Sequence, residues 1–186
     1  MKRRRQLQDK VVPVLTVLFA AAGFASAAQV STSTNADATS CQYDKASVLA
    51  LDYQTFDQTP GKGWRQLTSG DKCLVEAADL IREYRVSRSF PHPMLYWHEG
   101  QLRALRGSVA EAVRLMELSR PESGAITGWN EYVDVTIAFL RKDRPAFDKA
   151  TTALAAMPVA SFAGVVERMD RCFAKPYIQA YRVCEK

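Results

Sequence analysis

Apolar residues recur at helical spacing along almost the whole chain after residue 44, and no stretch alternates convincingly between apolar and polar positions. Residues three and four positions apart share one face of an α-helix, so each such group predicts a helix with one buried face. The groups are Cys73, Ala77, Leu80, Ile81 and Tyr84; Met94, Leu95, His98, Leu102 and Leu105; Val109, Ala112, Val113 and Met116; Trp129, Tyr132, Val133, Thr136 and Leu140; Phe147, Ala150, Leu154 and Met157; Val165, Val166, Met169 and Cys172; and Tyr177, Tyr181 and Cys184. The pattern predicts a single all-α domain over residues 41–186.

Two short turns join neighbouring helices in this pattern. Gly107 suits the left-handed position that ends a helix, and Ser108 with Glu111 has the spacing of a capping box that begins the next one. Further along, Asp143 is expected to cap a helix whose first turn contains Pro145. Each turn therefore predicts an antiparallel helical hairpin.

Longer connections rich in Ser, Pro and Gly separate these hairpins, over residues 86–92 and 120–128. Aligning the two hairpin turns places Gly107 on Lys142 and Ala112 on Phe147, a shift of 35 residues. The same shift backward from Ala112 reaches Ala77. A repeat of this length is close to the 34-residue tetratricopeptide unit.

The segment His98–Ala112 resembles the tetratricopeptide (TPR) family, since Gly100, Gly107 and Ala112 fall at positions where that family has small residues. The resemblance covers about residues 74–157, and Lys142 and Phe147 depart from the family pattern in the third unit. It implies stacked antiparallel hairpins that form a TPR-like α-solenoid of roughly three hairpins. A C-terminal helix pair over residues 164–184 is expected to cap the array.

The N-terminus has the three parts of a secretory signal peptide: basic residues 2–5, the apolar stretch 11–24 and the small-residue sequence 25–27. We expect residues 1–28 to be removed by cleavage near Ala27 or Ala28. The alternative is an uncleaved anchor, but the apolar run is shorter than the ~20 residues of a spanning helix. The mature chain is then periplasmic or secreted, without a stable membrane span, and residues 29–40 form a flexible polar N-terminus.

The net charge of the whole chain is +5, from 25 Lys and Arg against 20 Asp and Glu. Residues 1–28 hold five of the basic residues and one acidic residue, which leaves 20 basic and 19 acidic side chains in the rest. Phosphate recognition normally needs a surplus of basic side chains, so this composition argues against nucleic-acid binding.

The cysteines form an even set, Cys41, Cys73, Cys172 and Cys184, and an exported protein is expected to join them in disulfides. Three pairings are possible, of which Cys41 with Cys73 is preferred. Cys172 and Cys184 flank a turn expected at Lys175-Pro176, but Cys184 would lie about 12 Å further along its helix at a rise of about 1.5 Å per residue, which would strain that pairing. No Cys-x-x-Cys motif indicates redox catalysis, and metal binding by these residues is unsupported.

The chain has two histidines, His92 and His98, which restricts acid-base or zinc chemistry. His98-Glu99 begins like a zinc-protease helix, but Leu102 stands where the second ligand belongs, so a hydrogen-bonded, partly buried His98 is favoured. We expect no catalytic residue, metal or cofactor. A pair of carboxylates meeting in a cleft remains the enzymatic alternative, with candidates Asp44, Asp52, Asp57, Glu111, Glu117, Glu131 and Asp134.

Aromatic residues suggest a binding surface. In the TPR family the first helix of each hairpin lines a concave groove, and the 35-residue shift places Trp97 over Tyr132 and Met94 over Trp129. The candidate groove residues are Met94, Trp97, Gln101, Arg103, Trp129, Asn130 and Tyr132. The alternative is that Trp97, Trp129 and Tyr132 pack in the core.

The sequence therefore predicts a non-enzymatic exported adaptor or scaffold that binds a protein or peptide segment in a bacterial cell envelope. Two alternatives stay open: an envelope hydrolase that uses clustered carboxylates, and a protein of the inhibitor or immunity type. The sequence leaves the oligomeric state open.

Overall fold

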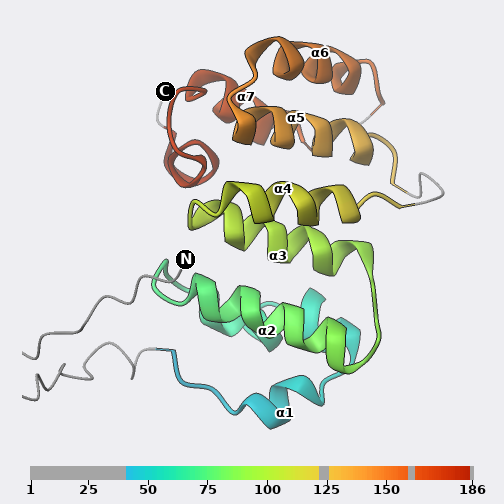
Figure 1. The fold of residues 1–186 in the computed structure, drawn as a ribbon, viewed down its shortest axis with the longest axis vertical. Coiled ribbons are helices and arrows are strands. Elements are labelled where there is room, and N and C mark those ends of the chain that lie inside the picture. Colours follow the sequence, from blue (N-terminus) through green and yellow to red (C-terminus); the bar gives the residue numbers. More distant parts are fainter. Residues whose placement is uncertain (1–40, 122–125, 159–161, 185–186) are drawn as a thin grey trace, which may run out of the picture. The chain divides into compact units, whose positions relative to one another are not determined.

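The computed structural model describes residues 41–121, 126–158 and 162–184, and every regular element in these ranges is helical (Figure 1). The predicted all-α class is confirmed. The predicted leader and polar N-terminus lie outside the described residues. The elements are α1 Lys45–Leu49, the π-helical turn η1 Gln54–Gln58, the 3₁₀ helix η2 Gly63–Thr68, α2 Leu74–Ser87, α3 Pro93–Leu105, α4 Val109–Leu118, α5 Trp129–Arg141, α6 Arg144–Ala155, α7 Ala163–Arg171 and the π-helical turn η3 Gln179–Val183.

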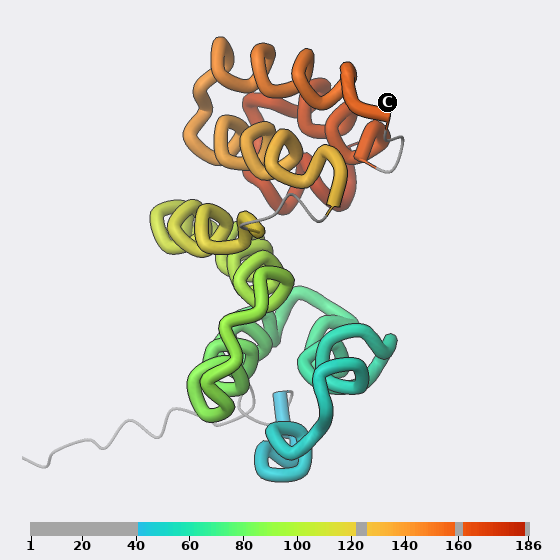
Figure 2. Tube along the Cα trace, turned by 90° about the vertical axis from the view of Figure 1, so that its right-hand side faces the viewer, coloured from blue at the N-terminus to red at the C-terminus, as the bar shows by residue number. Residues whose placement is uncertain are grey.

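The helices α2 to α6 follow one another in space as they do in the sequence, each in contact with the next (Figures 1 and 2). The helices α2, α4 and α6 begin at Leu74, Val109 and Arg144, at intervals of 35 residues. At the N-terminal side α1 and η2 pack on α2, and at the C-terminal side α7 contacts η3. Among the described residues, no helix is long and apolar enough to cross a bilayer.

The two hairpin turns have the same backbone hydrogen bonds, 35 residues apart. The amides of Gly107 and Ser108 donate to the carbonyls of Ala104 and Arg103. The amides of Lys142 and Asp143 donate likewise to the carbonyls of Phe139 and Ala138. In both turns the chain reverses at a residue with left-handed backbone geometry, Gly107 with φ 84° and Lys142 with φ 56°.

The two predicted caps differ in outcome. The Asp143 side chain accepts a hydrogen bond from the amide of Ala146 at 3.0 Å, which confirms this residue as the N-cap of α6. The predicted capping box at the start of α4 is wrong, because the Ser108 side chain makes no capping hydrogen bond. Glu111 lies instead 3.4 Å from the guanidinium of Arg103.

The close contact of α3 with α4 is centred on Gly100. A Cβ atom at this position would lie 3.2 Å from the carbonyl oxygen of Ala112 and 3.2 Å from Cγ of Met116, and Ala112 is fully buried. The prediction that small residues let two helices touch at Gly100 and Ala112 is confirmed at this pair.

We expect Gly100→Val to lower the free energy of unfolding by about 2 kcal/mol, because its branched side chain would overfill the α3–α4 contact. Urea unfolding followed by circular dichroism measures the change. Gly70→Val is the matched control, since a Cβ at Gly70 meets no atom within 4 Å. Equal stability losses in both variants would contradict a close contact at Gly100.

Candidate functional site

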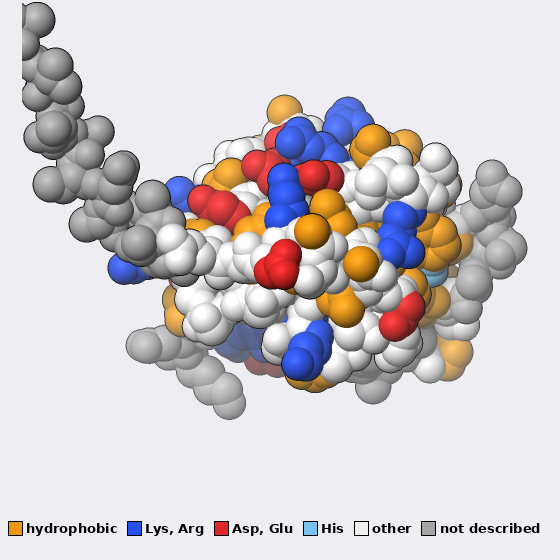
Figure 3. All heavy atoms as spheres, turned by 90° about the horizontal axis from the view of Figure 1, so that it is seen from below, with side chains coloured by type: hydrophobic (Ala, Val, Ile, Leu, Met, Phe, Trp, Pro, Cys, Tyr) orange, Lys and Arg blue, Asp and Glu red, His pale blue; other side chains and the backbone are white. Residues whose placement is uncertain are grey.

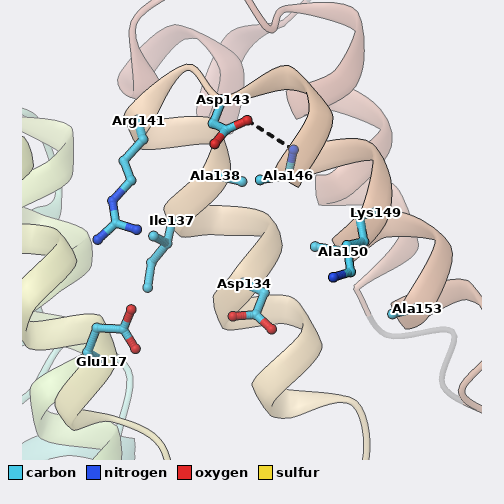
Figure 4. Close-up of a pocket in the computed structure, with 10 residues that line it drawn as sticks. All are labelled: Glu117, Asp134, Ile137, Ala138, Arg141, Asp143, Ala146, Lys149, Ala150 and Ala153. Carbon is cyan, nitrogen blue, oxygen red and sulfur yellow. Dashed lines mark hydrogen bonds between the residues drawn. The ribbon is translucent and has the colours of Figure 1, made fainter.

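A hollow of about 290 Å³ opens on the surface formed by α4, α5 and α6 (Figure 4). We call it the α4–α6 hollow. Its floor consists largely of methyl groups, because small side chains of α5 and α6 face each other where larger ones would fill the space. These residues are Ala138, Ala146, Ala150 and Ala153. Helix α5, which contributes Ala138, is buried along most of its length, so this side of the hollow lies on a well-packed helix.

Charged groups surround the floor. Glu117 comes from the end of α4, Asp134 and Arg141 from α5, and Lys149 from α6. Arg120 binds both carboxylates: its guanidinium lies 2.8 Å from Glu117 and 2.7 Å from Asp134. A third bond from Arg120, to the carbonyl of Asn130, fixes this guanidinium at the edge of the hollow.

Glu117 and Asp134 are the two carboxylates of the hydrolase alternative that line the hollow. Their side chains are 46% and 56% exposed, and Arg120 binds both. A glycosidase general acid keeps its proton because its surroundings are apolar and exclude opposite charge. Glu117 and Asp134 lack such apolar, enclosed surroundings, because both are exposed and bound by Arg120.

The predicted groove aromatics lie in the core, as the alternative interpretation proposed. Trp97, Trp129 and Tyr132 are 3%, 5% and 4% exposed. The ring centroid of Trp97 lies 4.9 Å from that of Trp129 and 5.2 Å from that of Tyr132. Phe162, which precedes α7, stacks on Tyr132 at 4.3 Å, and burial raises the pKa of the Tyr132 phenol. This aromatic cluster joins α3, α5 and the start of α7.

The remaining groove candidates occupy separate places. Met94 is half-buried and packs against the core, and the Gln101 amide donates to the hydroxyl of Tyr181 at 3.2 Å. The carbonyl of Asn130 accepts the hydrogen bond from Arg120. Arg103 is only 7% exposed. The structure therefore does not bring the seven predicted residues together as one open surface.

Arg103 is the buried centre of an ion-pair network that links three helices and reaches the surface at Asp79 and Glu111. It lies 2.6 Å from Asp79 of α2, 3.8 Å from Glu99 of α3 and 3.4 Å from Glu111 of α4. Glu99 is fully buried and binds Arg85 of α2 at 2.6 Å. Buried charges persist when they are paired in this way, so the network fixes how α2, α3 and α4 pack.

Asp57, one of the candidate carboxylates of the hydrolase alternative, is fully buried. Its Oδ1 atom accepts from the Trp64 indole at 2.8 Å and lies 2.8 Å from Nδ1 of His98. Burial alone would raise the pKa of this carboxyl, but the hydrogen bonds from His98 and Trp64 and the charges of His98 and Arg65 outweigh it and lower the pKa. The prediction of a hydrogen-bonded, partly buried His98 is confirmed.

The Asp57–His98 contact links η1 to α3, and the hydrogen bond from Trp64 to Asp57 links η2 to the same site. The carbonyl of Asp57 also accepts from Arg65 at 2.6 Å, and Gln58 donates to the second carboxylate oxygen. Its carboxylate is enclosed by donors and has no exposed surface, so it cannot take a proton from a bound substrate. We interpret this pair as structural.

Both disulfides are formed in the structure, Cys41–Cys73 and Cys172–Cys184. The preferred pairing is confirmed. The expected strain of the second pairing is wrong, because the segment after the expected turn ends in the π-helical turn η3 and not in a regular α-helix. The two Cα atoms of that pair lie 6.0 Å apart. Glu76 lies near Cys41 and Cys73, but the sulfur atoms in a disulfide are not the thiolates that bind metals.

Charges of both signs are interspersed on the face seen from the α1 end (Figure 3). Lys and Arg side chains alternate there with Asp, Glu and hydrophobic side chains. This face does not present the continuous basic patch that a phosphate backbone requires.

Comparison with known proteins gives no assignment: no protein-family model, no curated protein and no solved structure matches the chain.

Proposed function

We propose that this chain is a non-enzymatic exported adaptor, which binds a segment of another protein in the bacterial cell envelope through the α4–α6 hollow. The hollow itself is the observation that carries the proposal. It combines a methyl-lined floor on packed helices with charged groups at its edge. Protein interfaces commonly have this arrangement of an apolar centre and a polar rim.

The size of the hollow favours a protein segment over a small metabolite. Pockets for small molecules typically enclose about 300–1,000 Å³ and bury most of the ligand. The α4–α6 hollow, with about 290 Å³, is at the lower end of this range and is open to solvent, so it would leave much of a small ligand exposed. A few side chains of a docked segment would fill it.

The TPR-like arrangement and the export of the chain are part of the proposal. The 35-residue spacing of α2, α4 and α6 and the matching hydrogen bonds of the two hairpin turns support a helical repeat. Two disulfides support an oxidising compartment. The signal-peptide pattern of residues 1–28 agrees with that location, and we propose the periplasm or the exterior as the site of action.

The test is crosslinking in cells that express the full chain, followed by mass spectrometry. Ala153→Trp places an indole in the hollow, and because Ala153 is exposed the core is untouched. We expect a discrete protein partner to be captured by the unmodified chain and lost from this variant.

Ala110→Trp is the matched control, since Ala110 is exposed on α4 and does not line the hollow. It should retain the partner. Absence of a captured protein, or equal loss from both variants, would overturn the proposal. Circular dichroism on both variants verifies that helicity is unchanged.

A further inference from the structure

The acidic and basic groups of the α4–α6 hollow differ in how they are paired. Glu117 and Asp134 both bind Arg120, and Asp143 accepts the capping hydrogen bond from the Ala146 amide that Figure 4 draws. Every acidic side chain of the lining is thus already bound by a donor of the chain itself.

The two cations of the lining have no such partners. Within the ranges that the structure describes, no carboxylate lies within 4 Å of the charged nitrogens of Arg141 or Lys149. Neighbouring arginines behave differently: Arg144 binds Asp148 and Asp170, and Arg171 binds Glu167. Arg141 and Lys149, which both line the hollow, are therefore available to an anionic ligand.

Their positions suit a ligand that crosses the floor. Arg141 extends from the last turn of α5 toward the α4 side, and Lys149 lies on α6 at the other side, with the methyl groups of Ala138 and Ala146 between them (Figure 4). Two anionic groups joined by an aliphatic stretch would meet both cations and cover the floor.

We propose that the segment bound in the α4–α6 hollow is acidic, and that Arg141 and Lys149 bind side-chain carboxylates of its Asp or Glu residues. This inference rests on the proposed adaptor function and specifies its partner. A basic segment would have to compete with Arg120 for Glu117 and Asp134, whereas an acidic one meets two cations that have no carboxylate partner. A membrane surface fits poorly too, since binding of anionic lipids typically uses clusters of about four to eight Lys and Arg residues.

The test is an NMR titration of the isotope-labelled protein, purified from cells that express the full chain. The probes are two peptides with blocked ends, one of alanines and two glutamates and the other of alanines and two lysines. We expect the glutamate peptide to shift the amide signals of Ala138, Ala146 and Ala150, and the lysine peptide to leave them unchanged. Raising the salt concentration should weaken the binding.

The double variant Arg141→Gln, Lys149→Gln should bind the glutamate peptide roughly tenfold more weakly. Its matched control is Lys62→Gln, Lys72→Gln, which removes the same charge from two exposed lysines outside the hollow and should bind as the unmodified chain does. Glutamine keeps part of the aliphatic stem and a polar end group at both positions. Circular dichroism compares the helicity of all three proteins.

Three outcomes would overturn the proposal that the bound segment is acidic: no shifts with the glutamate peptide, equal shifts with the lysine peptide, or equal weakening of binding in the control variant. Co-sedimentation with phosphatidylglycerol vesicles that is lost in Arg141→Gln, Lys149→Gln would assign the cations to lipid and would also overturn it. The adaptor function is judged separately in cells. A partner that Ala153→Trp loses but Arg141→Gln, Lys149→Gln retains would leave the adaptor standing without the acidic segment.

Discussion

Replacing Trp97 with alanine should lower the free energy of unfolding by about 4 kcal/mol, the loss that follows when a large aromatic side chain is removed from a packed core. Trp97 is 3% exposed and contacts the rings of Trp129 and Tyr132. Removing its indole leaves a cavity that these rings can fill only in part. Urea unfolding followed by tryptophan fluorescence and circular dichroism measures the loss.

Phe90→Ala is the control for this prediction. Phe90 is 36% exposed, so its truncation removes less buried area and should lower stability by roughly 1 kcal/mol. If Trp97→Ala unfolds like the unmodified protein while losing a bound partner, Trp97 belongs to a binding surface and its place in the core is wrong.

Replacing Asp57 with alanine should lower the free energy of unfolding by about 3 kcal/mol. The carboxylate accepts from Trp64 and contacts His98, and its loss leaves those buried groups without their acceptor. Urea titration at neutral pH measures the effect. Asp52→Ala, which removes an exposed carboxylate bound to the Thr55 amide, should lose only about 1 kcal/mol. Equal losses in the two variants would contradict a buried structural role for Asp57.

The pH dependence of stability gives a second readout for Asp57. Because folding lowers the pKa of this carboxyl below its ordinary value of 3.8, its charged form stabilises the folded state above that value. This contribution disappears as the pH falls below 3.8 and the folded carboxyl takes up its proton. The stability difference between the unmodified protein and Asp57→Asn should therefore narrow in acid.

Local signals in the sequence predicted the helices and their turns. A left-handed Gly107 and a capping Asp143 depend on residues within one turn of the chain, so they determine where hairpins reverse whatever packs around them. The capping box failed because Glu111 binds Arg103 of the preceding helix instead. Whether Glu111 caps its own helix or binds Arg103 depends on how α3 packs on α4, and the spacing of Ser108 and Glu111 contains no information about that packing.

The role of the aromatic residues could not be predicted for a related reason. A helical stripe shows that Trp97, Trp129 and Tyr132 share an orientation, but it does not show what covers them. Phe162, 30 residues beyond Tyr132, stacks on that ring and helps to close the cluster. A surface groove and a core thus have the same sequence pattern until the C-terminal segment is placed.

The contact between Asp57 and His98 joins residues 41 positions apart. Asp57 itself lies before α2, in a stretch with little regular helix. Helical periodicity carries no information about such a stretch. The Cys172–Cys184 bond was misjudged because a regular α-helix was assumed after the expected turn, where the chain forms the π-helical turn η3. The methyl floor of the α4–α6 hollow left a weak signal, the alanines at 146, 150 and 153 on one side of a helix.

The most direct test of the α4–α6 hollow as a binding site is photo-crosslinking from within it, in cells that express the full chain. A photoreactive phenylalanine at Ala153 lines the hollow, and the same group at Val86, which is 68% exposed on α2, serves as the control. The adaptor account predicts a protein crosslink at Ala153 that is absent at Val86. A crosslink of equal yield at both positions, or none at Ala153, would contradict it.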